Sequence, residues 1–147
     1  MVRAGLQSDI NAIVAMSSEF WSQTIYDVPA IDADLSLMAN ACIEQRLMSV
    51  LEVGGAVVGF ACAVAGPLLA NHSVKTATEL AWWVNPDHRS GRNGIGLLRH
   101  LERLAKDAGV RYFNMAYMES SMPEEIKSIY ERLGYSRAEV IYCKELA

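Results

Sequence analysis

The residues best suited to chemistry in this chain lie together in the stretch from Asn85 to Leu98, NPDHRSGRNGIGLL. The stretch combines three glycines with Arg89 and Arg92, and no acidic residue follows Asp87 within it. An apolar run precedes it, and apolar residues at helical spacing follow it. A helix N-terminus carries unpaired N–H groups and partial positive charge, glycine lets a ligand approach the backbone, and arginine adds a full charge. The stretch therefore predicts a turn that holds a phosphate-bearing ligand.

Positioning such a turn requires a strand before it and a helix after it. The sequence predicts a strand from Thr76 to Val84, and then a helix that ends at Gly109, a residue suited to a helix C-cap. The apolar residues expected on one face of that helix are Ile95, Leu98, Leu101, Leu104, Ala105 and Ala108.

The chain before residue 76 is predicted to form three strands and two helices. They are a strand at 2–6, a helix from an N-cap at Ser8 to Trp21, a helix from Asp32 or Asp34 to about Gln45, and strands at 46–53 and 56–65 joined by Gly54-Gly55. Residues 26–29 are expected to be a loop because proline disfavours helical geometry in the residue before it. Residues 68–75 are expected to be a connection.

After the long helix the sequence predicts a strand at 110–118, a helix from Pro123 to Leu133 that stops at Gly134, and a terminal strand at 135–146. Consecutive strands favour antiparallel pairing, while a strand–helix–strand passage favours a parallel pair. The predicted fold class is therefore α/β, a single domain over residues 1–147 built on one mixed, mostly antiparallel sheet with helices on its faces.

Composition narrows the class of protein. The 147 residues are 52% hydrophobic and 20% charged, as in ordinary globular domains, and the net charge of −4 argues against a broad nucleic-acid surface. Cys42, Cys62 and Cys143 are odd in number and far apart, so they indicate buried thiols rather than a disulfide framework or a zinc site. No signal peptide or membrane-spanning run is recognisable, and we expect a soluble, cytoplasmic protein with no membrane partner.

Two motifs resemble the GNAT superfamily of N-acetyltransferases. The first runs from Val84 through Asn85-Pro86-Asp87-His88-Arg89 and the turn to Leu97-Leu98, and the second is Ile129-Tyr130-Glu131-Arg132-Leu133-Gly134-Tyr135. The second motif is similar to the family's Tyr-x-x-x-Gly-aromatic ending. The resemblance implies a sheet of six to seven strands that is splayed in its middle and flanked by about four helices. It also implies acetyl-CoA as cosubstrate and no metal.

The resemblance further implies where the cofactor binds. The family's pyrophosphate loop is usually Arg/Gln-x-x-Gly-x-Gly/Ala, and Arg89-Ser90-Gly91-Arg92-Asn93-Gly94 matches it except that Arg92 replaces the first glycine. The expected cofactor contacts are the strand end, Trp82, Trp83 and Val84, and the turn, Arg89, Ser90, Gly91, Arg92, Asn93, Gly94 and Ile95. The alternative is an ordinary strand-to-helix connection with solvated arginines.

Two residues are candidates for catalysis. In strand alternation Glu79 shares a face with Ala81 and Trp83, and a carboxylate among such neighbours has a raised pKa that suits a general base. Many family members place a glutamate on this strand; the alternative is a solvated residue or a structural ion pair. Tyr130 matches the family tyrosine that serves the departing thiolate, and its alternative role is core packing.

The sequence thus predicts an enzyme that moves the acetyl group of acetyl-CoA to a primary amine by direct attack in a ternary complex. The acceptor is a small molecule or a peptide, and its identity stays open among polyamines, amino acids, antibiotics and protein amines. Family habit and the apolar terminal strand suggest a homodimer. Two alternatives are a catalytically inactive GNAT-like binding or regulatory module, which the departures at Arg92 and Met122-Pro123 favour, and an interaction domain that does not bind CoA.

Overall fold

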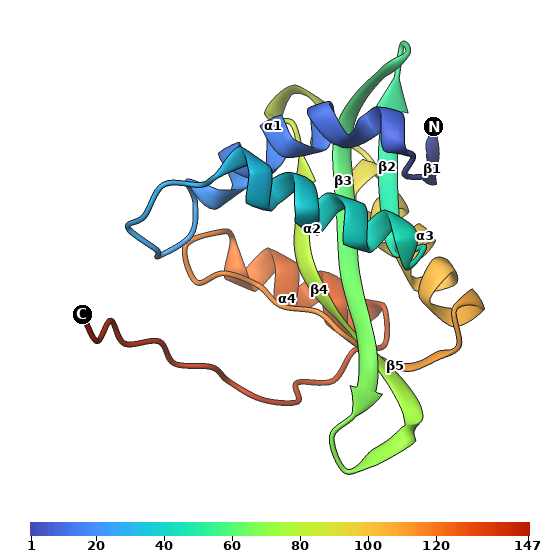
Figure 1. Cartoon of the computed structure of the whole chain (residues 1–147), viewed down its shortest axis with the longest axis vertical. Coiled ribbons are helices and arrows are strands. Elements are labelled where there is room, and N and C mark those ends of the chain that lie inside the picture. Colours follow the sequence, from blue (N-terminus) through green and yellow to red (C-terminus); the bar gives the residue numbers. More distant parts are fainter. The chain divides into compact units, whose positions relative to one another are not determined.

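The computed structural model describes all 147 residues, which divide into two compact units, Met1–Ala116 and Tyr117–Ala147 (Figure 1). In chain order the first unit contains β1 (Val2–Ala4), α1 (Ile10–Trp21), α2 (Asp32–Glu44), β2 (Met48–Val53), β3 (Ala56–Leu68), β4 (Asn71–Val84), α3 (Asn93–Asp107) and β5 (Val110–Asn114). The five strands form one sheet in the order β1-β2-β3-β4-β5. Every neighbouring pair is antiparallel except β4 and β5, which are parallel. The predicted mixed, mostly antiparallel sheet is confirmed.

The sheet of the first unit is covered on both faces. α1 and α2 cross one face, in front of the strands in Figure 1, and bury a core that includes Ile13, Met16, Ala39 and Phe60. α3 packs on the other face through Leu97, Leu101 and Ala105, which recur at helical spacing. Burial of these two apolar cores is the main force that holds β4 and the residues after it in place.

The hairpin of β3 and β4 is longer than the sequence indicates. The sequence predicts a connection at residues 68–75, but β3 continues to Leu68 and β4 begins at Asn71. Pro67 does not end the strand, although the register shifts next to it. At this point β3 has passed the end of its pairing with β2, so the missing N–H of proline leaves no ladder bond unmade on that side.

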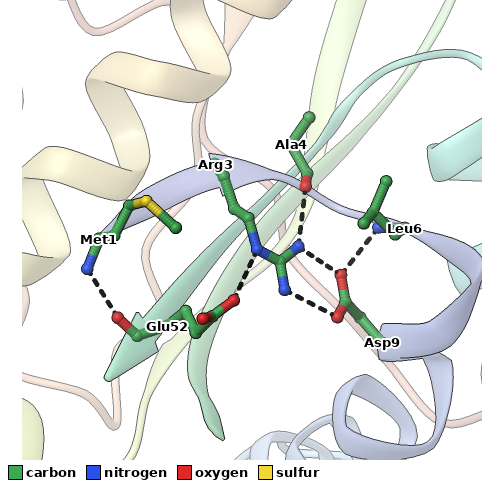
Figure 2. A network of polar contacts seen from close by, with 6 residues as sticks. All are labelled: Met1, Arg3, Ala4, Leu6, Asp9 and Glu52. Carbon is green, nitrogen blue, oxygen red and sulfur yellow. Dashed lines mark hydrogen bonds and ion pairs between the residues drawn. The ribbon is translucent and has the colours of Figure 1, made fainter. Parts of the chain in front are cut away.

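An ion-pair network attaches β1 to the end of β2 (Figure 2). The guanidinium group of Arg3 donates to both carboxylate oxygens of Asp9, at 2.7 and 3.0 Å, and its Nε donates to Glu52 at 2.8 Å. The N-terminal ammonium group of Met1 donates to the backbone carbonyl of Glu52 at 2.6 Å. Asp9 is buried, and Arg3 lowers the pKa of its carboxyl group. We interpret this network as structural.

The start of α1 differs from the prediction. Ser8 lies inside a short 3-10 turn, Gln7–Asp9, and does not cap the helix. The carboxylate of Asp9 accepts the backbone N–H of Leu6 at 2.8 Å instead. The carboxylate of Asp9 is held in this position because it also forms an ion pair with Arg3.

The second unit contains one helix, α4 (Pro123–Arg132), with proline in its first turn as predicted. The helix ends at Arg132; Gly134, two residues later, has a φ of +90° that suits glycine, and the N–H of Tyr135 closes the end by donating to the carbonyl of Tyr130 at 3.0 Å. Residues 135–146 form no strand, and β5 ends at Asn114 rather than at residue 118.

The strand count is therefore five, and the expected six to seven is too high. The terminal residues have the β-branched and aromatic composition of a strand, but a strand also requires a neighbour that accepts its backbone hydrogen bonds. Val140, Ile141 and Tyr142 are instead exposed.

Candidate active site

The sheet splays where β4 leaves β5. The parallel pairing of these strands covers Lys75 to Thr78 of β4 and ends at Asn114 of β5. β4 continues to Val84 while paired only with β3, so its other edge has no strand partner from Glu79 onward. The predicted splay is confirmed, and it leaves a backbone edge to which an extended ligand can hydrogen-bond.

β4 carries one extra residue beside Glu79. Ala81 is paired with Cys62 and Glu79 with Ala63, so Leu80 is left without a partner on β3. Cys62 belongs to the core beneath α1 and α2, whereas Ala63 belongs to the core beneath α3. Directly paired residues share a face, and the predicted strict alternation that placed Glu79 on the face of Ala81 is therefore wrong. Such a bulge re-aims a side chain.

The surroundings of Glu79 change the pKa of its carboxyl group. Its side chain is only partly exposed, and burial raises its pKa to about 7. The backbone N–H of Ala116, two residues beyond the end of β5, donates to the carboxylate and opposes the rise. A carboxyl group with this pKa exchanges a proton readily near neutral pH, as a general base must.

The turn after β4 is held by contacts among its own residues. The Nε of Arg89 donates to the carbonyl of Val84 at 2.7 Å, and its guanidinium group lies over the ring of Trp83 at 4.5 Å. The side-chain amide of Asn93 donates to the carbonyl of His88 at 2.9 Å. Arg89 thus has a structural role in the turn, while its two Nη groups make no hydrogen bond within the chain.

The N-terminus of α3 has no side-chain cap. Gly91 has a φ of +70°, which turns the chain into the helix, and the N-cap residue Arg92 makes no capping hydrogen bond. The first helical bond runs from the N–H of Gly96 to the carbonyl of Arg92 at 2.7 Å. The three N–H groups between them therefore have no helical acceptor. The first turn carries no acidic residue, so it is a favourable site for an anion.

Gly94 lets this helix end approach the strand. A Cβ at Gly94 would lie 3.2 Å from the ring of Trp82, closer than most such contacts. Trp82 itself packs in the α3-side core, and Trp83 packs on the opposite side, beneath α1 and α2. The predicted cofactor residues are thus brought together as one strand end, one turn and one helix N-terminus.

Tyr130, the other catalytic candidate, lies on α4 in the second unit. It is buried, and its ring is tilted against that of Tyr135, with centroids 5.5 Å apart. Its role stays a prediction.

Sequence reasoning missed two features of the site, the bulge at Leu80 and the N–H of Ala116 on Glu79. The bulge is a property of the register between two strands, and nothing in the residues around Leu80 marks it. The contact from Ala116 depends on where β5 ends, which the sequence placed four residues too late.

A groove of about 620 Å³ also lies between α1 and α2. None of its lining residues belongs to the sheet, so it is separate from the edge of β4.

No helix has the length and apolar composition needed to cross a membrane. No group of three or more His, Cys, Asp or Glu side chains is arranged to hold a metal ion.

The chain is similar to known proteins in both sequence and fold. The sequence profile of the acetyltransferase (GNAT) family matches residues 13–135. No curated protein sequence matches the chain. Among solved structures, a predicted acetyltransferase with acetyl-CoA from Clostridium acetobutylicum is 16% identical with a TM-score of 0.75, over 99% of this chain and 95% of that one.

Two further structures have the same fold. A ribosomal-protein-alanine N-acetyltransferase from Brucella melitensis biovar Abortus 2308 is 15% identical with a TM-score of 0.71, over 99% of both chains. The aminoglycoside N-acetyltransferase AAC(6')-Iy in complex with CoA is 14% identical with a TM-score of 0.75, over 100% of this chain and 95% of that one. At these identities the likeness shows the fold alone.

Proposed function

Because the chain belongs to the acetyltransferase (GNAT) family, we propose that it transfers the acetyl group of acetyl-CoA to an amine. The observation that carries the proposal is the continuity of the free edge of β4 with the uncapped N-terminus of α3. The free edge of β4 can hydrogen-bond an extended, amide-containing arm, and the uncapped N-terminus of α3 can bind a pyrophosphate. The two binding features follow each other along the chain in the order in which the arm and the pyrophosphate follow each other in CoA.

The residues of the turn hold the anionic part of the cofactor. The N–H groups of Asn93, Gly94 and Ile95 point along the axis of α3 without a helical acceptor, and the exposed side chain of Arg92 adds a full charge beside them. Arg89 fixes the turn through Val84 and Trp83, and its Nη groups are left for a phosphate oxygen. Ser90 and Gly91 complete the loop. Arg92 thus adds positive charge at the position where the family usually has glycine.

Glu79 is the proposed general base. A protonated amine cannot attack a thioester, so a group that removes the proton directly or through a water molecule raises the rate. The carboxylate, with a pKa of about 7, is ionised in a large fraction of molecules at neutral pH and still basic enough to accept that proton. Backbone N–H groups at the end of β4 polarise the thioester carbonyl, and the hydroxyl group of Tyr130 serves the departing thiolate.

The charge of the first two helices supports an amine acceptor. Residues 4–45 contain six carboxylates and no lysine or arginine. One of the six, Asp9, is paired with Arg3, and the other five make no ion pair. Tyr26 and Asp27, in the loop between α1 and α2, are exposed beside them. A region of this charge attracts a cationic acceptor.

The test separates binding from turnover. Calorimetry measures whether CoA binds to the full-length chain, and thiol release from acetyl-CoA is followed with a panel of amines. Acetyl transfer to any amine supports the proposal. CoA binding without turnover across the panel would instead favour the inactive binding module, and no heat at millimolar CoA would exclude a CoA-dependent activity.

A further inference from the structure

Three sulfur atoms meet in the core between α2 and β3, where Cys62 is paired with Ala81 of β4. Met38 and Cys42 lie one helical turn apart on α2, and Cys62 lies on β3. The sulfur of Met38 is 4.0 Å from that of Cys42 and 3.7 Å from that of Cys62. Both thiols donate to the thioether sulfur of Met38. Both cysteines are fully buried, with 0% exposure.

We propose that Met38, Cys42 and Cys62 form a binding site for one copper(I) ion. Thiolate and thioether sulfur are the ligands that soft monovalent copper prefers, and neither a carboxylate nor an imidazole belongs to the group. Three sulfur ligands placed roughly 2.3 Å from one ion in a trigonal arrangement lie about 4.0 Å apart, and the sulfur of Met38 is 4.0 Å from that of Cys42 and 3.7 Å from that of Cys62. Zinc is disfavoured because its structural sites need four ligands.

The charge balance of copper(I) binding requires only the release of protons. Each cysteine loses its thiol proton to solvent as its sulfur bonds to copper, so two protons leave and the oxidation state of copper does not change. Because both cysteine ligands must give up a proton, protons compete with copper(I) for the site.

Met38 gives the ion a route to the buried thiols. It is only partly buried, whereas both cysteines are closed to solvent. An unbranched thioether side chain changes rotamer at little cost. Met38 can therefore take up the ion at the surface of α2 and pass it inward. Its replacement should weaken binding and slow it.

The experiment uses the full-length chain with Cys143→Ser, which removes the exposed thiol that would bind copper adventitiously. Copper(I) is supplied without oxygen as its bicinchoninate complex, and transfer to the protein is followed by the loss of the colour of that complex. We expect one copper per chain and the release of two protons.

The variants assign the ligands. Met38→Leu keeps the side-chain volume and should lower the affinity about tenfold, a loss of about 1.4 kcal/mol. Met16→Leu is the matched control, since Met16 is a methionine buried in the same core but outside the sulfur triangle, and it should bind like the parent. Cys62→Ala should abolish competition with bicinchoninate. Retention of all copper by the chelator would overturn the proposal, and so would equal affinity in the parent, Met38→Leu and Cys62→Ala proteins.

Discussion

If Glu79 is the general base, activity and stability depend in opposite directions on the ionisation of its carboxyl group. Its carboxylate must be ionised to accept a proton, and its pKa is about 7. We therefore expect kcat/KM to rise with pH through about 7 and then level off. Glu79→Gln should lower kcat/KM at pH 8 about hundredfold and remove the inflection, whereas Glu145→Gln, which changes an exposed carboxylate, should keep both rate and profile. An inflection near pH 7 that persists in Glu79→Gln would assign it to another group.

The same carboxylate should destabilise the fold at high pH. Its pKa rises from the ordinary value of 4.5 to about 7 in the folded chain, so the folded state binds the proton more tightly. The stabilisation that this provides is complete below about pH 4.5 and is lost as the pH rises through 7. The loss is at most roughly 3 kcal/mol, and solvent contact reduces it. Glu79→Gln should therefore raise Tm more at pH 8 than at pH 5; an equal change at both pH values would contradict the raised pKa.

Arg92 distinguishes this pyrophosphate turn from the usual family loop. If its guanidinium group contacts the pyrophosphate, Arg92→Ala should weaken CoA binding about tenfold and should leave the binding of pantetheine, which has no phosphate, unchanged. Arg99→Ala is the matched control, since Arg99 is exposed nearly two turns further along α3. Calorimetry with both ligands measures the effect. Equal weakening of CoA and pantetheine would mean that the substitution distorts the turn instead.

Among the elements, β1 carries Arg3, whose ion pair with Asp9 links the strand to the start of α1. Asp9 is buried and accepts two hydrogen bonds from Arg3 and one from the backbone of Leu6. We expect Asp9→Asn to lower the free energy of unfolding at pH 7 by about 1–3 kcal/mol, because it leaves part of the network unpaired. Asp27→Asn, which changes an exposed loop residue, should have little effect.

The pH dependence of that difference follows from the lowered pKa of Asp9. A depressed pKa stabilises the fold above the unfolded-state pKa, near 3.8, and this contribution is lost as the pH falls through the folded-state value. Denaturant titrations of the two proteins should therefore converge in acid. A difference that stays constant from pH 7 to pH 2.5 would show that the charge of Asp9 is not its source.

The elements also show what sequence patterns can specify. Local signals placed α1, α2, α3 and α4 and the Gly54-Gly55 hairpin, because prolines, glycines and helical periodicity act over a few residues. The predicted caps Ser8 and Asp32 or Asp34 are wrong, since neither α1 nor α2 has a side-chain cap. The other errors concern pairing between distant segments. The continuation of β3 beyond Pro67, the bulge at Leu80, the early end of β5 and the absent terminal strand all depend on which neighbour a strand has. Within the site, the place of the turn between β4 and α3 could be predicted, whereas the face occupied by Glu79 could not.

At the scale of the whole molecule, the assignment of residues 1–147 to a single domain is testable because the two units differ in length and in secondary structure. Tyr117–Ala147 is 31 residues long and contains one helix of 10 residues. Isolated helices of this length are marginal in water, and chains below about 40 residues rarely fold without disulfides or metals. Such a segment is too small to unfold as a separate cooperative unit.

We therefore expect one unfolding transition for the whole chain. All three tryptophans, Trp21, Trp82 and Trp83, lie in Met1–Ala116, so their fluorescence reports that unit alone. A fluorine label on Tyr135, observed by NMR, reports the other unit. Urea titrations followed with both probes should have the same midpoint and slope if the chain is a single domain. An earlier midpoint for the Tyr135 probe would show that Tyr117–Ala147 unfolds on its own and that the chain does not behave as one domain.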